Sequence, residues 1–212
     1  MKVLAIDTAS PDASVALLSS GRIFEEALPS ERRASEELLP ALRRVLESAG
    51  AALQDCDRLA VCAGPGSFTG VRVGLATAWG LSRAAGIPLE TVSTLEALAE
   101  TMRGSGAATR VLAALEAGRG EVVCRLFALG ARRAEPMGET VRVTPDRARE
   151  LANGSAVAAL PADLLGTPGS ARPRPAAALA RAVASAPGDA ASSLEAFYSR
   201  PSAAEEKRGV AP

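Results

Sequence analysis

The 212-residue chain contains no histidine, and its only lysines, Lys2 and Lys207, lie near the two ends. Histidine is the usual general base, the usual proton shuttle and the commonest metal ligand of proteins. A catalytic site in this chain would have to be built from Asp, Glu, Ser, Thr, Cys and Arg, which is a narrow set for an enzyme. We therefore expect neither a metal site nor a catalytic residue.

No excess of either charge is present, since 24 Lys and Arg balance 24 Asp and Glu. This balance favours neither direct nucleic-acid binding nor an acidic membrane surface. Three cysteines, Cys56, Cys62 and Cys124, lack Cys-x-x-Cys spacing, and we expect them to be reduced and mostly buried. Asp7 interrupts the apolar start too early for a signal peptide, and no apolar run approaches the ~20 residues of a membrane span. These features predict a cytosolic protein.

Apolar periodicity in the first half predicts strands, helices and their ends. The expected strands are 2–8, 13–19, 22–28, 59–63 and 89–92, and the expected helices run from Ser35 to Ala49 and from Val71 to Ala85. Pro40 is tolerable in a first helical turn. Gly50 is expected as a left-handed C-cap, and Ser93 with Glu96 predicts a capping box.

The second half repeats this pattern after a Gly-Ser-Gly linker at 104–106. Its expected strands are 111–116, 121–129, 139–143 and 156–160, and its expected helices begin at Pro145 and Ala176. Two βββα halves predict a duplicated α/β fold with a mixed sheet in each lobe. The predicted division is an N-terminal lobe over 1–103, a C-terminal lobe over 107–200 and a tail over 201–212.

A glycine-rich loop between an expected strand and an expected helix is the most informative motif. Its residues are Gly64, Pro65, Gly66, Ser67, Phe68, Thr69 and Gly70. One interpretation is an anion cradle at a helix N-terminus. A Walker A loop is excluded, because Val71 and Arg72 follow where Lys and Ser or Thr belong. A dinucleotide site is the competitor, with Glu90 about 20 residues on as the ribose ligand, although the third glycine comes one place late.

The helix after this loop carries a face of small side chains. Gly70, Gly74, Ala78 and Leu81 follow helical spacing, and a face with so little bulk lets another element approach closely. Trp79, which flanks this face, is a residue type that often anchors interfaces. The face can pack inside its own lobe or dock a partner helix, and the sequence favours neither.

Asp7 and Thr8 end the first strand, where actin-like and sugar-kinase-like ATPases place an aspartate that faces magnesium and phosphate. The alternative is an Asx turn, in which Asp7 or Ser10 bonds to its own backbone. The second half offers no matching acid. Leu115 aligns with Asp7, and Glu116 is one residue further and points to the other face of the strand.

Several motifs together resemble the TsaB (YeaZ) family of bacterial accessory proteins in tRNA threonylcarbamoyladenosine biosynthesis. The motifs are Leu4-Ala5-Ile6-Asp7-Thr8, Glu37-Leu38-Leu39-Pro40, the block from Gly64 to Arg72, Val92-Ser93-Thr94-Leu95, Gly120-Glu121-Val122 and Tyr198-Ser199-Arg200-Pro201. The resemblance covers most of residues 1–130, and the glycine block is its most specific part.

The resemblance implies an actin-like/sugar-kinase-like (ASKHA) fold without the metal-binding histidines of the catalytic relative TsaD. It implies a heterodimer with TsaD or a homodimer, the ATPase TsaE as a further partner, and contact with tRNA only through the complex. TsaD transfers threonylcarbamoyl to N6 of adenosine 37, and ATP with Mg²⁺ would bind only in complex with partners. The expected interface residues are Leu38, Leu42, Gly70, Arg72, Gly74, Leu75, Ala78 and Trp79.

Our leading hypothesis is thus a non-catalytic scaffold that enables TsaD. An older association of this superfamily with metallopeptidase activity conflicts with the absence of histidine. The alternatives are a weak Mg²⁺-dependent ATPase or phosphotransferase that uses Asp7 and Thr8, and a dinucleotide-binding domain.

Overall fold

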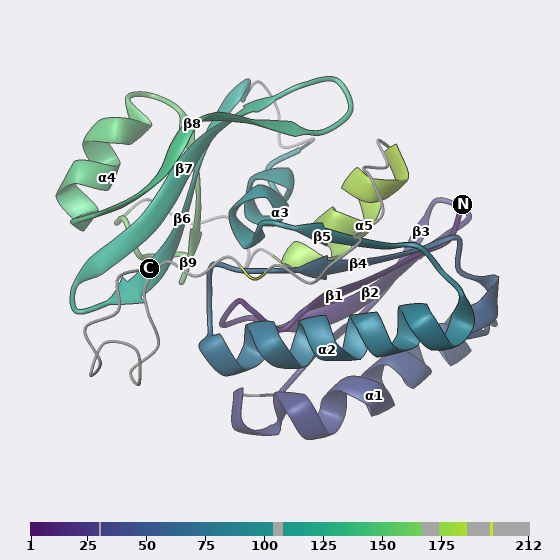
Figure 1. The fold of residues 1–212 in the computed structure, drawn as a ribbon. Helices are drawn as coiled ribbons and strands as arrows, with labels where there is room; N and C mark the ends of the chain where they lie inside the picture. The colour runs from purple at the N-terminus through teal and green to yellow at the C-terminus, as the bar shows by residue number, and fades with distance from the viewer. Residues whose placement is uncertain (30, 104–107, 167–173, 186–195, 197–212) are drawn as a thin grey trace.

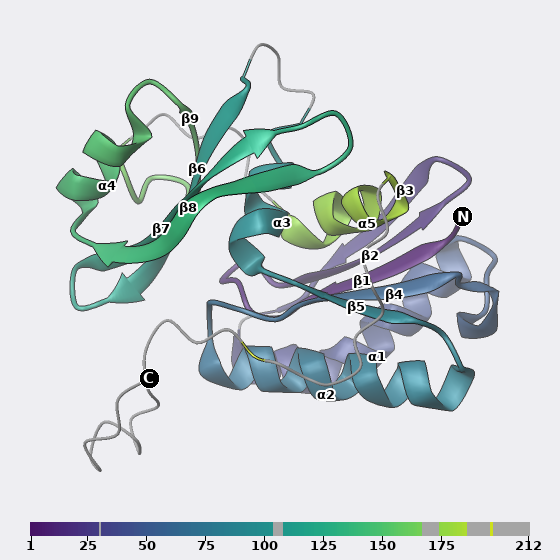
Figure 2. The same ribbon diagram turned by 45° about the horizontal axis from the view of Figure 1, so that its top comes forward.

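The computed structural model describes residues 1–29, 31–103, 108–166, 174–185 and 196. Figure 1 and Figure 2 show two β-sheets, with helices on their outer sides and between them. The predicted tail over 201–212 and the motif at Tyr198–Pro201 lie outside the described residues.

The first sheet has five strands in the order β3-β2-β1-β4-β5. They are β1 (Val3–Asp7), β2 (Ser14–Ser19), β3 (Arg22–Ala27), β4 (Arg58–Cys62) and β5 (Leu89–Val92). The first three form an antiparallel meander, and β4 and β5 run parallel to β1. Every residue of β1 and β2 is buried, because helices cover both faces at the centre of the sheet. The strands predicted for this half are confirmed.

The second sheet repeats the topology of the first, with the order β8-β7-β6-β9. Its strands are β6 (Arg110–Gly118), β7 (Glu121–Leu129), β8 (Ala134–Val143) and β9 (Ala156–Leu160). β9 is parallel to β6, and the other pairs are antiparallel. The predicted duplication into two mixed sheets is confirmed.

Strand β8 begins at Ala134, earlier than the predicted Glu139. The added part contains Pro136 and Gly138, residues that are usually typical of turns. An edge strand tolerates both, because one of its sides needs no hydrogen-bond partner. Most of β8 is exposed, so its sequence carries no apolar alternation that would have predicted the whole strand.

Helices α1 (Glu31–Ser48) and α2 (Phe68–Ala85) lie side by side on one face of the first sheet (Figure 1). A single 3-10 turn (Leu53–Asp55) follows α1. Because α1 begins before the predicted Ser35, Pro40 lies inside the helix rather than in its first turn. Pro40 is exposed, so water can reach the carbonyl group that the missing N–H leaves unpaired.

The ends of the helices follow their sequence signals. Ser67 caps α2 by accepting a hydrogen bond from the Gly70 N–H at 3.2 Å, and Gly86 ends α2 with φ of 69°. Gly50, after α1, has φ of 61°. The predicted left-handed conformation of Gly50 is therefore confirmed.

The remaining helices are shared between the sheets. Helix α3 (Thr94–Glu100) packs its Leu95 and Leu98 under the second sheet, and α4 (Pro145–Ala152) covers the outer face of that sheet (Figure 2). Helix α5 (Pro175–Ser185) packs on the first sheet, on the face opposite α1 and α2.

This arrangement differs from the predicted division of the chain. The segment 107–200 was assigned to the C-terminal lobe, whereas α5 contributes Ala176, Leu179 and Val183 to the core of the first. Helix α3, assigned to the N-terminal lobe, contributes Ala97 to the core of the first sheet and Leu95, Leu98 and Ala99 to the core under the second. Periodicity shows that a helix has an apolar face, but it does not show which sheet that face covers.

We expect Leu179→Ala to lower the free energy of unfolding by about 2–5 kcal/mol, because it empties a fully buried position between α5 and the first sheet. Arg181→Ala, at an exposed position of the same helix, should change it by less than about 0.5 kcal/mol. Urea unfolding of both variants checks this placement of α5. Equal changes in the free energy of unfolding for the two variants would contradict this placement.

Candidate functional site

The candidate site lies where β1 ends and the first hairpin turn meets the glycine loop. Leu4 lines a groove on the side of α1 and α2, so Asp7, at an odd spacing from it, points to the opposite face of the sheet. Asp7 and Thr8 are buried, and so is Cys62 at the end of the neighbouring strand β4. The position is the one that the ATPase hypothesis required.

The Asp7 carboxylate is bound by the turn that follows it. Its Oδ1 accepts hydrogen bonds from the Ala9 N–H at 3.0 Å and the Ser10 N–H at 3.2 Å. Its Oδ2 accepts a hydrogen bond from the Ser10 hydroxyl. This is the Asx turn that was weighed against the ATPase hypothesis.

The glycine loop fills the space in front of this turn. A Cβ at Gly66 would lie 2.1 Å from the Ala9 carbonyl oxygen, and a Cβ at Gly70 would lie 1.9 Å from the Thr8 carbonyl oxygen. The Thr8 hydroxyl donates to the Gly70 carbonyl at 2.6 Å. Backbone meets backbone here, and only glycine allows so close an approach.

Two amide groups of the loop, and the amide of Val71 after it, bind within the chain. The Ser67 N–H donates to the Ala9 carbonyl at 2.8 Å, the Gly70 N–H to the Ser67 hydroxyl, and the Val71 N–H to the Ser67 carbonyl at 2.8 Å. A phosphate cradle would present such groups to the ligand. The glycine loop therefore serves as a packing element between α2 and the first hairpin in this structure.

Burial raises the pKa of Asp7 above its ordinary value of 3.8, and the hydrogen bonds from Ser10 and Ala9 oppose this only in part. Burial also raises the pKa of the Cys62 thiol well above 9.0, and the nearby Asp7 carboxylate adds to the effect. A cysteine held as a neutral thiol is a poor nucleophile. All three cysteines are buried and unpaired, as expected.

In the described part of the second lobe, no acid stands at the position that matches Asp7. Leu115, the counterpart of Asp7, is buried, and Glu116 is exposed on the other face of β6. Among the described residues, no group of three or more His, Cys, Asp or Glu side chains could hold a metal ion.

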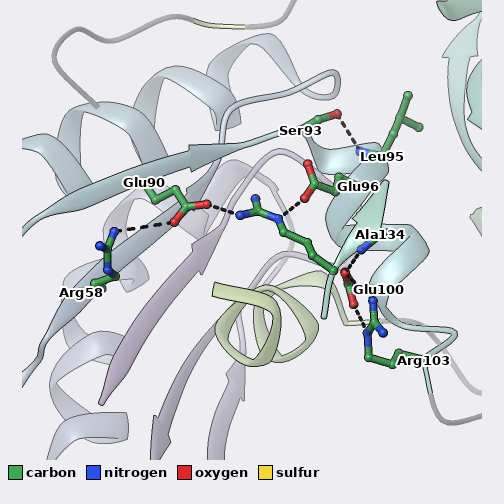
Figure 3. A network of polar contacts seen from close by, with 9 residues as sticks. Arg58, Glu90, Ser93, Leu95, Glu96, Glu100, Arg103 and Ala134 are labelled. Atoms are coloured by element: carbon green, nitrogen blue, oxygen red, sulfur yellow. Dashed lines mark hydrogen bonds and ion pairs between the residues drawn. The ribbon is translucent and has the colours of Figure 1, made fainter. Parts of the chain in front are cut away.

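Glu90, the expected ribose ligand of the dinucleotide hypothesis, is engaged elsewhere. It is 4% exposed, its carboxylate binds Arg133, and it lies 3.9 Å from Arg58 (Figure 3). The sheet also contradicts this hypothesis, because an antiparallel meander precedes the glycine loop where a dinucleotide fold has parallel strands.

Arg133 is the residue that sequence reasoning missed. It lies after β7 in a short turn, and it binds both Glu90 on β5 and Glu96 on α3. Glu96 was expected to complete a capping box, and its carboxylate faces Arg133 instead, while Ser93 caps the Leu95 N–H at 3.2 Å as expected. Ion pairs between distant segments leave no local signal in a sequence.

The small face of α2 packs inside its own lobe. Gly74 and Ala78 are buried, and a Cβ at Gly74 would lie 2.4 Å from the Thr8 hydroxyl oxygen. Leu38 and Leu75 are also buried in the core of the first sheet. In this structure β1 and β4 cover Gly74 and Ala78, so these two residues are not at the surface that a partner would meet.

The outward sides of α1 and α2 carry other apolar groups. Leu39 is 58% exposed, and it lines a groove of about 290 Å³ together with Leu42, Leu46 and Leu81. Arg43 and Glu47 stand at the same groove. The structure thus places Leu39 at the surface of α1.

Small residues also face outward on α2, but they are not the residues of the predicted small face. Ala76 and Gly80 are exposed, and a Cβ at Gly80 would meet no atom within 4 Å. Arg72 is exposed with its guanidinium 3.8 Å from the centre of the Phe68 ring, and Trp79 is partly exposed beneath Arg83. Arg72 and Trp79 are thus the predicted interface residues that a partner could reach.

Comparison with known families gives a match over residues 28–186 to the family model described as TsaD, tRNA N6-adenosine threonylcarbamoyltransferase. The TsaB protein of Escherichia coli (strain K12) is 43% identical over 124 residues, which are 58% of this chain and 53% of that protein. An uncharacterised protein of Mycobacterium tuberculosis (strain ATCC 25618 / H37Rv) is 32% identical over 162 residues, 74% of each chain. The chain spans about half the length of the TsaB relatives it matches.

Among solved structures, YeaZ from Pseudomonas aeruginosa is similar over 93% of this chain and 99% of its own, with 28% identity and a TM-score of 0.74. The predicted actin-like/sugar-kinase-like fold class is confirmed by this likeness and by the duplicated mixed sheets. In the described part of the chain, no helix has the length and apolar character to cross a membrane.

We expect Gly70→Ala to lower the free energy of unfolding by about 1–3 kcal/mol, because the added methyl group collides with the Thr8 backbone. Gly80→Ala, in the same helix but facing open space, should raise it by up to about 1 kcal/mol. Chemical unfolding of the two variants measures the difference. If Gly70→Ala left the free energy of unfolding unchanged, the loop would not depend on this close approach.

The buried Asp7 should make stability depend on pH. Its raised pKa means that the folded state binds more protons than the unfolded state just above pH 3.8, so the free energy of unfolding falls as the pH rises through that window. The free energy of unfolding of the parent minus that of Asp7→Asn should fall by at most about 1.4 kcal/mol per pH unit as the pH rises, and should then level off. A difference that rises with pH would contradict this sign.

Proposed function

The chain belongs to the TsaD family, among its TsaB (YeaZ) members, and from this premise we propose that it is a non-catalytic subunit of the tRNA N6-threonylcarbamoyladenosine machinery. In this proposal it binds TsaD, with the ATPase TsaE joining the complex, and TsaD performs the transfer. Contact with tRNA is indirect, and the place of action is the cytoplasm. The equal numbers of acidic and basic residues support a complex in which the partner, rather than this protein, forms most of the tRNA-binding surface.

The observation that carries the proposal is the apolar groove on the outward side of α1 and α2. Leu39 is more than half exposed at this groove, although a leucine loses favourable free energy when it faces water. Exposed apolar surface of this kind, with charged residues such as Arg43 and Glu47 beside it, is typical of protein–protein contact. We therefore move the proposed TsaD contact from the buried glycine face to Leu39, Leu46 and Leu81.

The enclosed acid supports the non-catalytic part of the proposal. Asp7 has no exposed surface, and its carboxylate oxygens already accept hydrogen bonds from Ala9 and Ser10. A magnesium ion would need these oxygens and space for several waters. The ATPase hypothesis thus requires the turn to release this carboxylate.

Leu39→Glu should abolish the TsaD heterodimer on a sizing column, because it places a charge in an apolar contact. The same variant should lower threonylcarbamoylation of tRNA at least ten-fold in a mixture of TsaD, TsaE and threonylcarbamoyl-adenylate. Met137→Glu is the matched control, since Met137 is also an exposed apolar side chain but lies on β8 of the second lobe. It should leave both measurements unchanged.

Activity that is equal with and without this protein would overturn the proposal, and so would full activity of Leu39→Glu. Asp7→Ala distinguishes the alternative function. Retained activity supports a scaffold, whereas its loss in a variant that is folded and still binds TsaD would indicate a nucleotide or metal site at β1.

A further inference from the structure

We propose that Arg133 is a latch that holds the second lobe against the first in one fixed orientation. Such a latch is a property of this protein alone and is independent of the proposed function. Arg133 lies in the turn between β7 and β8 of the second sheet, and from there it reaches the edge of the first sheet.

The guanidinium of Arg133 bridges two elements. One nitrogen, Nη1, donates to Glu90 on β5, which is the edge strand of the first sheet, and Nε donates to Glu96 on α3. Glu90 is almost completely buried, and the Glu96 side chain is 18% exposed. A planar guanidinium can hold two carboxylates at once, which a lysine ammonium does with less directional control.

The same turn is held a second time through its backbone. The Ala134 N–H donates to Glu100 at the end of α3, and Arg103 donates to the Gly130 carbonyl at 2.8 Å. Arg103 also binds Glu100 at 2.6 Å (Figure 3). Both ends of the turn are thus fixed to α3, and Arg133 adds the connection to the first sheet.

The charges of this network balance one another. Its carboxylates are Glu90, Glu96 and Glu100, and its guanidiniums are Arg58, Arg103 and Arg133. Burial raises the pKa of Glu96, and Arg133 opposes this by stabilising the charged form. Without Arg133, Glu90 and Glu96 would lie close together with no cation between them as long as the two lobes stay in contact. Separation of the lobes would let water solvate both carboxylates.

The contact beside the latch would not by itself fix one orientation. Helix α5, which contacts α3, consists largely of alanine. Small side chains interlock little, so helices that contact through them can slide with a small loss of packing. The directed hydrogen bonds of Arg133 supply the orientation that this apolar contact lacks.

The test compares Arg133→Gln with Arg132→Gln, which changes the exposed arginine next to it. Spin labels on Gln54→Cys and Glu139→Cys, at exposed positions of the two lobes, report the distance between them, because the three native cysteines are buried. We expect Arg133→Gln to broaden and shift the distance distribution, and Arg132→Gln to match the parent. Exchange of the Ala134 amide hydrogen should become at least ten-fold faster only in Arg133→Gln.

Exchange of amides in the centres of both sheets shows whether each lobe remains folded. If Arg133→Gln does not accumulate as a folded protein, Glu90→Gln takes its place, because it removes only the charge on the first sheet and leaves Arg133 bound to Glu96. A broadened distribution in either folded variant supports the latch. A distribution and an Ala134 exchange rate equal to those of the parent overturn it.

Discussion

The close approach between the N-terminus of α2 and the first hairpin turn is the contact on which the rest of the first lobe depends. Gly66 and Gly70 bring the loop backbone against the carbonyl groups of Ala9 and Thr8. This contact fixes the rotation of α2 on the sheet, since Gly74 must also face Thr8. The same rotation turns Gly80 outward, so it determines which side of α2 is exposed.

The two lobes are joined by contacts of different character. Helices α3 and α5 each pack on the sheet of the other repeat, and they contact each other. Beside them, Arg133 connects Glu90 and Glu96 across the junction. Apolar contacts supply most of the favourable free energy of such a junction because they bury area, while paired charges add direction and are costly to leave unpaired.

The enclosed corner and the open groove lie on opposite faces of one sheet. On one face, Asp7 keeps the place of an ATPase acid but has its oxygens bound by its own turn. On the other face, Leu39 remains exposed between two helices. A duplicated α/β fold of this kind can keep its core when a site on one face is filled, and its opposite face can still carry a different surface.

Local signals in the sequence determined the strands, the glycine ends of the helices, the duplication and, through the glycine block, the family resemblance. They act over a few residues, where turn geometry and apolar alternation suffice. Tertiary structure alone decided that α5 covers the first sheet, that Gly74 faces Thr8 rather than a partner, and that Arg133 meets Glu90. Each of these depends on which segments become neighbours across tens of residues, and a one-dimensional pattern that fits several packings cannot choose among them.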